Sequence, residues 1–128
     1  MAGELILIVE DNERNLKLLR DVLGAYGYRI LEARSAEDAL VLARAERPQL
    51  VLMDIQLPGM DGLAALRNLR AAPETRATPV IAVTAFAMKH DRERLLSAGV
   101  DGYLEKPVNV RELPSYLRSY IAPSAIGT

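Results

Sequence analysis

The sequence contains no cysteine, almost no net charge and no long apolar run, and each absence removes a class of function. Without cysteine there is no disulfide, no thiol chemistry and no cysteine-based zinc site, which fits a reducing compartment. The formal net charge of -1 lacks the positive excess typical of nucleic-acid-binding proteins. No apolar run approaches the roughly 20 residues of a membrane-spanning helix, and the N-terminus lacks the pattern of a signal peptide. We therefore expect a cytoplasmic protein that binds neither nucleic acid nor membrane.

The chain has 128 residues, of which 50% are hydrophobic and 26% charged, and this balance is typical of one ordinary globular domain. No internal repeat or low-complexity segment divides it. We assign residues 1–122 to a single domain and residues 123–128, which follow the last apolar run, to a short tail.

Short apolar runs alternate with segments of helical periodicity. The pattern predicts strands at 5–9, 30–33, 50–54, 80–83 and 102–105, and helices at about 13–26, 36–47, 62–69, 88–98 and from 110 onward. Continuous apolar runs are typical of strands that are buried on both faces. The alternation therefore predicts a doubly wound α/β domain with one parallel sheet and helices on both faces, although the pattern alone leaves the strand order open.

Several helix ends carry their own signals. Leu16, Leu19, Leu23 and Tyr26 recur on one face of the first helix. Ser35 is placed as the N-cap of the second helix, and Gly99 as the C-cap of the fourth. Asn109 can cap the last helix, but Pro114 lies one turn in, so it either marks a later start or removes one backbone hydrogen bond.

Polar side chains follow four of the five predicted strands. Glu10 and Asp11 follow the first strand, Asp54 ends the third, Thr84 follows the fourth and Lys106 follows the fifth. Because the carboxyl ends of parallel strands share one edge of the sheet, where ligands bind in such folds, we expect these side chains to form one site.

The chemistry of this expected site points to a cation and a phosphoryl group. Each pair of like charges at about 4 Å costs on the order of 4 kcal/mol at an effective dielectric constant near 20. A carboxylate must therefore take up a proton or a cation must bind, and a ligand set of oxygens alone favours a hard divalent ion such as Mg²⁺. With its charge compensated, Asp54 can act as a nucleophile that forms an aspartyl phosphate, while Thr84 and Lys106 bind phosphoryl oxygens. A plain ion pair between Lys106 and Asp54 is the alternative, but it leaves Glu10 and Asp11 without a reason.

At these residues the chain resembles the response-regulator receiver domains of bacterial two-component signalling. The matching segments are 8–12, 52–58, 83–85 and 106–107, and the likeness extends from Leu5 to Ile121. Segments 54–58 and 83–89 further resemble stand-alone receivers of the DivK type and the receivers of hybrid histidine kinases. The resemblance implies the CheY-like, flavodoxin-like (βα)5 fold with strand order 2-1-3-4-5.

The resemblance also implies a role for each site residue. Asp54 would accept a phosphoryl group from a phosphohistidine on a sensor histidine kinase or a histidine phosphotransfer protein. Mg²⁺ would be held by Asp11, Asp54, the backbone carbonyl of Gln56, and Glu10, which replaces the Asp of many relatives. Further expected residues are the phosphoryl-binding Thr84, Ala85 and Lys106, the switch residues Thr84 and Tyr103, the cis-proline Pro107, and Gln56 and Phe86, which would tune loss of the phosphoryl group.

The implied protein is a switch that is controlled by phosphorylation. Its only catalytic activities would be the transfer of a phosphoryl group to itself and the removal of that group. Its phosphodonor partner would dock near the first helix and the Pro107 loop, and its downstream protein target would bind the fourth helix, fifth strand and fifth helix. Three alternatives stay open: a receiver cut from, or acting with, a hybrid histidine kinase phosphorelay, a Mg²⁺-dependent aspartyl-phosphate phosphatase, and a receiver that is never phosphorylated. Phosphatases of that kind carry a second acid where this chain has Gln56. A flavin- or nucleotide-binding module of the same architecture is disfavoured because the first loop, 10–13, is acidic and free of glycine, which is unsuited to binding phosphate.

Overall fold

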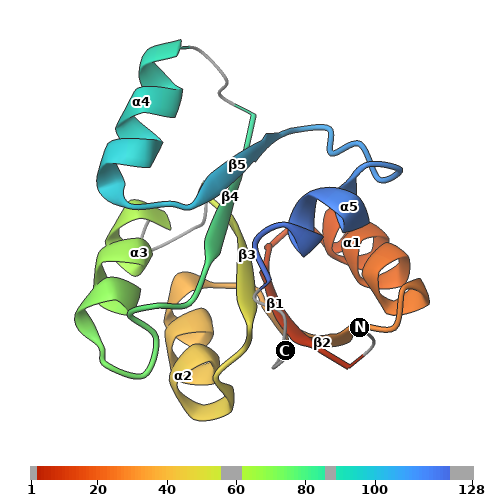
Figure 1. Ribbon diagram of the computed structural model, residues 1–128, viewed down its shortest axis with the longest axis horizontal. Coiled ribbons are helices and arrows are strands. Elements are labelled where there is room, and N and C mark those ends of the chain that lie inside the picture. Colours follow the sequence, from red (N-terminus) through yellow and green to blue (C-terminus); the bar gives the residue numbers. More distant parts are fainter. Residues whose placement is uncertain (1–2, 56–61, 86–88, 122–128) are drawn as a thin grey trace.

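The computed structural model describes residues 3–55, 62–85 and 89–121, with 89–92 as backbone only. Strands and helices alternate along the described residues (Figure 1). The elements are β1 (Leu5–Val9), α1 (Glu13–Ala25), β2 (Arg29–Ala33), α2 (Ala36–Glu46), β3 (Leu50–Asp54), α3 (Gly62–Ala71), β4 (Val80–Thr84), α4 (Lys89–Ala98), β5 (Gly102–Glu105) and α5 (Leu113–Arg118).

The sheet is parallel, with strand order β2-β1-β3-β4-β5. This confirms both the alternation read from the sequence and the order that the resemblance implied. The chain runs from β1 outward to β2, returns to β3 on the other side of β1 and then continues to β4 and β5. The strand order therefore reverses between β1 and β3, and in open α/β sheets ligands bind at the carboxyl ends of the strands at that point.

Two apolar cores fill the spaces between the sheet and its two helical layers. Ile6 and Ile8 of β1 belong to a core with α1 and α5, whereas Leu7 and Val9 belong to a core with α2, α3 and α4. Figure 1 shows these two groups of helices on opposite sides of the sheet. Because alternate residues of a strand face opposite sides, a strand between two helical layers must be apolar throughout, as β1, β3 and β4 nearly are.

Most helix ends agree with their sequence signals. Ser35 Oγ accepts a hydrogen bond from the Asp38 amide and caps α2, and Gly99 ends α4 with a φ of 108°. Tyr26 is an exception, because it is the C-cap of α1 and its side chain is exposed, so it does not continue the buried face of Leu16, Leu19 and Leu23. Among the described residues, none of the helices has the length and apolar character needed to cross a membrane.

The expected N-cap of the last helix is wrong. Helix α5 begins at Leu113 with Glu112 as its N-cap, and Pro114 lies in the first turn, where a missing N–H removes no intrahelical bond. Asn109 instead forms the turn before the helix: its Oδ1 accepts from the Arg111 amide at 3.0 Å, and its carbonyl accepts from the amide of Leu113 at 3.1 Å. Pro114 therefore marks the later start that the sequence had left open.

Candidate functional site

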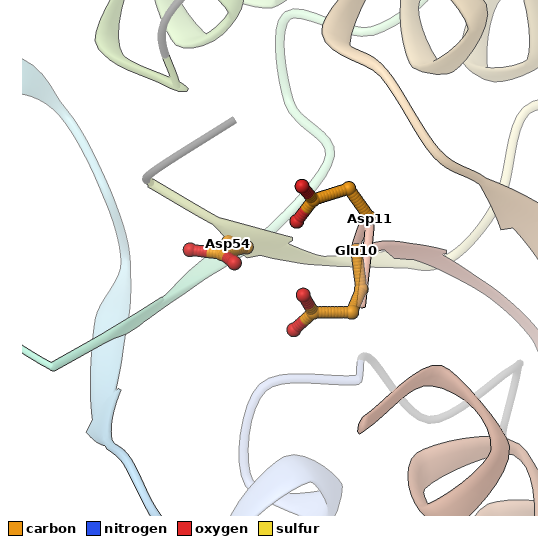
Figure 2. Close-up of side chains that lie close together, drawn as sticks. All are labelled: Glu10, Asp11 and Asp54. Atoms are coloured by element: carbon orange, nitrogen blue, oxygen red, sulfur yellow. The ribbon is translucent and has the colours of Figure 1, made fainter. Parts of the chain in front are cut away.

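Three carboxylates meet at the carboxyl edge of the sheet. Glu10 and Asp11 come from the turn after β1, and Asp54 is the last residue of the adjacent strand β3. One carboxylate oxygen from each lies within 4.8 Å of the others, and Figure 2 shows the three groups gathered in one space. Glu10 and Asp54 are each only 2% exposed, while Asp11 is exposed. The pairing of β1 with β3 is what brings these acids together.

The turn between β1 and α1 fixes the direction of Glu10. The Asn12 amide donates to Glu10 Oε2 at 3.1 Å, and the Glu10 amide donates to the Ala33 carbonyl at 2.9 Å. Asn12 is also the N-cap of α1, since its Oδ1 accepts from the Asn15 amide at 3.0 Å. Sequence reasoning did not assign this function to Asn12, although an Asn directly before a helical segment is the ordinary N-cap signal.

Lys106, at the end of β5, reaches across to the two buried acids. Its Nζ lies 2.8 Å from Asp54 Oδ2 and 3.4 Å from Glu10 Oε1. The Lys106 amide donates to the Thr84 carbonyl at 2.8 Å, and the Lys106–Pro107 peptide bond is cis, as the resemblance implied. The ammonium therefore compensates part of the negative charge from the side of β4 and β5.

Burial and neighbouring charges change the protonation of this cluster. Burial raises the pKa of Glu10, and the nearby Asp54 charge adds to this effect, while the Asn12 amide and Lys106 oppose it. Burial alone would lower the pKa of Lys106, but its hydrogen bond to Asp54 and the charges of Asp54 and Glu10 outweigh burial and raise it. Three acids against one ammonium leave negative charge uncompensated. This excess, together with oxygen ligands only, fits a hard divalent cation such as Mg²⁺.

The remaining residues expected at the site are Thr84, Ala85, Tyr103, Gln56 and Phe86. Thr84 is buried at the end of β4, the neighbour of β3, and Ala85 follows it and is exposed. Tyr103 is half-buried on β5 and packs against the core on the α2, α3 and α4 side. Gln56 and Phe86 lie outside the described residues. Of the basic residues of α4, Arg94 is exposed, while Lys89, His90 and Arg92 are described as backbone only.

An apolar pocket opens beside the cluster. Its volume is about 290 Å³, and it lies between α1 and the segment after β5. The lining residues are Glu10, Asn15, Leu18, Leu19, Val83, Lys106, Pro107 and Val108. Leu18 is 46% exposed and lies next to the buried face of α1. A leucine just outside the buried face of a predicted helix is the sequence signal that could have revealed the pocket.

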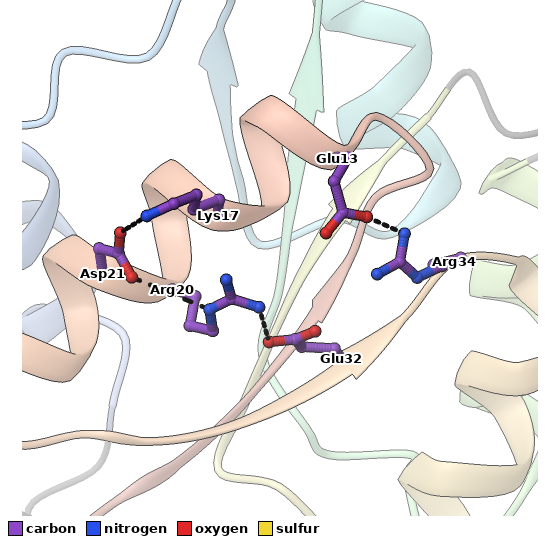
Figure 3. A network of polar contacts seen from close by, with 6 residues as sticks. All are labelled: Glu13, Lys17, Arg20, Asp21, Glu32 and Arg34. Carbon is purple, nitrogen blue, oxygen red and sulfur yellow. Dashed lines mark hydrogen bonds and ion pairs between the residues drawn. The ribbon is translucent and has the colours of Figure 1, made fainter.

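A network of ion pairs fixes the opposite side of α1 to β2 (Figure 3). Arg20 Nη1 lies 2.7 Å from Glu32 Oε2, and Arg34 pairs with Glu13 at the start of the helix. Lys17 and Asp21 add a pair at 2.7 Å within α1. Each of these pairs is at least partly exposed and contributes little stability. Asn15 and Leu18 of the same helix line the pocket.

Comparison with known proteins identifies the family. The family model described as the response regulator receiver domain matches residues 6–118, which is most of the chain. The chain is a response-regulator receiver domain. The receiver is 48% identical over 116 residues to the polar-differentiation response regulator DivK of Brucella anthropi, covering 91% of this chain and 94% of that protein. The DivK regulator of Brucella ovis is equally similar over the same length.

Solved structures give the same result. The receiver superposes on the receiver domain of a sensor histidine kinase from Pseudomonas aeruginosa with a TM-score of 0.87 and 40% identity, covering 94% of this chain and 98% of that one. That crystal structure has a magnesium ion coordinated in its active-site cleft. The signal receiver domain of a histidine kinase from Syntrophus aciditrophicus gives a TM-score of 0.87 at 30% identity, covering 98% and 96% of the two chains. The resemblance to receivers and the likeness to DivK regulators are confirmed, and the phosphatase alternative is not favoured.

Proposed function

We propose that this receiver accepts a phosphoryl group from a phosphohistidine onto Asp54 and thereby switches a protein–protein interaction. The observation that carries the proposal is the placement of Asp54. It is buried at the carboxyl end of β3, hydrogen-bonded to Lys106 and grouped with Glu10 and Asp11. A carboxylate in this setting is shielded from water yet faces the edge of the sheet where ligands bind.

The transfer forms one bond and breaks one. A carboxylate oxygen of Asp54 attacks the phosphorus, the bond from phosphorus to the histidine nitrogen breaks, and that nitrogen leaves with its electron pair. Lys106 holds Asp54 in place and afterwards binds a phosphoryl oxygen, with the Thr84 hydroxyl and the Ala85 amide as further contacts. Mg²⁺ would be held by Glu10, Asp11, Asp54 and the Gln56 carbonyl. Its positive charge would offset the negative charge of the incoming phosphoryl group.

Two surfaces serve the two partners in this proposal. A sensor kinase or a histidine phosphotransfer protein docks on the apolar pocket, where Leu18, Pro107 and Val108 lie beside the acidic cluster. A downstream protein binds the face of α4, β5 and α5, and Thr84 and Tyr103 pass the phosphorylation state to it. We assign residues 1–122 to the receiver and 123–128, outside the described residues, to a tail, and we place the protein in the cytoplasm.

Intact mass after incubation with acetyl phosphate and Mg²⁺ tests the proposal. The unmodified chain is expected to gain one phosphoryl group and to lose it with time, while Asp54→Asn gains none. Asp38→Asn is the matched control, because Asp38 is exposed on α2 and its amide, rather than its side chain, takes part in the helix cap. Labelling of Asp54→Asn would identify another acceptor, and labelling in excess chelator would contradict the role of Mg²⁺.

The same samples separate a switch from a phosphatase. A receiver holds at most one phosphoryl group per molecule at any one time, whereas a phosphatase releases many equivalents of phosphate from a phosphate monoester. We expect no sustained release of phosphate from p-nitrophenyl phosphate above the level of Asp54→Asn. Sustained turnover that depends on Asp54 would instead favour the phosphatase.

A further inference from the structure

Helix α4 has an uneven distribution of apolar residues. Its first six residues, 89–94, are all charged or histidine, and its apolar residues Leu95, Leu96 and Ala98 follow in the second half. Among its described side chains, Leu95 is buried at 3% exposure and Leu96 is 50% exposed. Leu95 therefore holds the carboxyl half of the helix to the core, and the sequence offers no apolar residue in the amino half.

Arg70, at the end of α3, is bonded to the chain around the carboxyl end of α4. Its Nη2 donates to the Gly99 carbonyl at 3.0 Å and to Asp101 Oδ2 at 2.7 Å. Its Nη1 donates to the Arg76 carbonyl at 3.1 Å and to the Thr78 carbonyl at 2.6 Å. One guanidinium thus joins the loop before β4 to the loop after α4, using the fixed fork of donors that distinguishes arginine from lysine.

Asp101 carries this connection into the sheet. Its Oδ2 also accepts from the Val80 amide at 2.8 Å, and its own amide donates to the Val80 carbonyl at 2.8 Å. Val80 begins β4, so Arg70 and Asp101 fix the end of α4 at the amino edge of the sheet, opposite the edge that holds Asp54. Gly99 lies between the end of α4 and Asp101, and its φ of 108° is a conformation that suits glycine where the chain changes direction sharply.

We propose that Arg70 is the fixed joint of α4: it holds the carboxyl end of the helix, so that phosphorylation at Asp54 displaces only the first turns. The inference rests on the proposed function, because α4 follows β4, whose last residue, Thr84, lies beside the site. A helix fastened at one end and polar at the other responds to a change at Thr84 by rotating about the fastened end. Arg70 is thus a positioning residue for the output face and takes no part in the transfer itself.

Amide hydrogen exchange, followed by fragment mass analysis, tests the joint in the unmodified full chain. Arg70→Met is expected to speed exchange in residues 95–101 by about tenfold, since hydrogen bonds to charged groups are lost and the end of the helix opens locally. Arg67→Met, exposed on the same helix, is the matched control and should leave this region unchanged. Asp101→Asn, which removes the ion pair but keeps an acceptor for Val80, should give an intermediate effect and guards against a variant that fails to fold.

Exchange before and after acetyl phosphate treatment tests the regulatory half, with intact mass recorded on the same samples. In the unmodified sequence, phosphorylation should change exchange in 89–94 and leave 95–101 unchanged, whereas in Arg70→Met the change should extend through 95–101. Equal changes along the whole of α4 in the phosphorylated unmodified sequence would overturn the joint. Absence of any phosphoryl gain would overturn the proposed function, while an unaltered 95–101 in unphosphorylated Arg70→Met would overturn the joint independently.

Discussion

At the scale of single residues, Gly62 shows how closely the segment around Asp54 is packed. Its amide donates to the Ile55 carbonyl at 3.2 Å, and a Cβ on Gly62 would lie 2.7 Å from the Ile55 Cα and 3.1 Å from that carbonyl oxygen. Ile55 directly follows Asp54 in the chain. Only a glycine allows the start of α3 to approach the residue beside the acceptor this closely.

Gly62→Ala is therefore expected to be destabilised by about 1–3 kcal/mol, as overpacked sites are, and to take up the phosphoryl group more slowly because the backbone beside Asp54 must shift. Urea unfolding and intact mass after acetyl phosphate treatment measure the two effects. Gly24→Ala is the control of opposite sign: Gly24 lies within α1 with open space around it, so alanine should stabilise the protein by roughly 0.5–1 kcal/mol. Equal behaviour of the two variants would show that the close approach is unimportant.

At the scale of elements, a pair of tyrosines closes the outer edge of β5. Tyr116 of α5 donates its hydroxyl to the Tyr103 carbonyl at 3.1 Å and lies 3.3 Å from the Tyr120 hydroxyl, with the two ring centroids 5.2 Å apart. Both hydroxyls lie over Gly102, where a Cβ would come within 2.6 Å of Tyr116 and 2.7 Å of Tyr120. A side chain of the neighbouring helix thereby donates a hydrogen bond to the backbone of this edge strand.

This contact predicts how stability depends on alkaline pH. Burial, followed by the hydrogen bond and the charge of Tyr120, raises the pKa of Tyr116 from 10.0 to about 12. Because the pKa is higher in the folded state, Tyr116 contributes stability that is fully present below pH 10 and is lost as the pH rises toward 12. Tyr116→Phe should therefore show a shallower fall in melting temperature across this range and lack the last tyrosinate step in ultraviolet absorbance. Tyr26→Phe, at an exposed position, should retain the steeper fall in melting temperature and the last tyrosinate step. A Tyr26→Phe profile like that of Tyr116→Phe would contradict the assignment.

At the scale of the whole molecule, the acidic cluster joins elements that are far apart in the sequence. Glu10 and Asp11 follow β1, Asp54 ends β3, and Lys106 comes from the far edge of the sheet. A cation that binds these acids in the folded state, and binds the unfolded chain weakly, stabilises the whole domain through mass action.

Mg²⁺ at about 100 times its dissociation constant is expected to stabilise the protein by roughly 2.7 kcal/mol, and so to raise the melting temperature by several degrees. The comparison is a thermal melt in Mg²⁺ against one in chelator with ionic strength matched by NaCl. Asp11→Asn should reduce the gain, because it removes one carboxylate of the cluster, and the exposed Asp38→Asn should not. A gain of the same size in Asp11→Asn would mean that Mg²⁺ acts elsewhere on the surface.

The sequence determined by itself the alternation of elements, the two-sided burial of the central strands and the polar residues at the ends of four of the five strands. These follow from local rules: a strand between two helical layers must be apolar throughout, so the first polar residues after it mark its end. Ser35, Gly99 and the runs 5–9 and 50–54 were readable for this reason. The Asn109 cap and the buried Tyr26 were wrong because helix ends depend on hydrogen bonds with the following turn and on packing against neighbours, which periodicity does not contain.

Only the tertiary structure decided the distances between the groups that the sequence placed at one edge, the contacts made away from that edge and the surfaces that result. Four features of the structure join residues that are separated in the chain. They are the contacts among Glu10, Asp54 and Lys106, the pocket beside Leu18, the fit of Gly62 against Ile55 and the four hydrogen bonds of Arg70. Parallel pairing is non-local, because two parallel strands must be joined by a long crossover segment. The residues of that segment say little about which strands will lie side by side in the sheet. The sequence supplied the chemical groups and their places at the strand ends. The order of the strands places the carboxyl ends of β1, β3, β4 and β5 next to one another and so brings these groups within reach of one another.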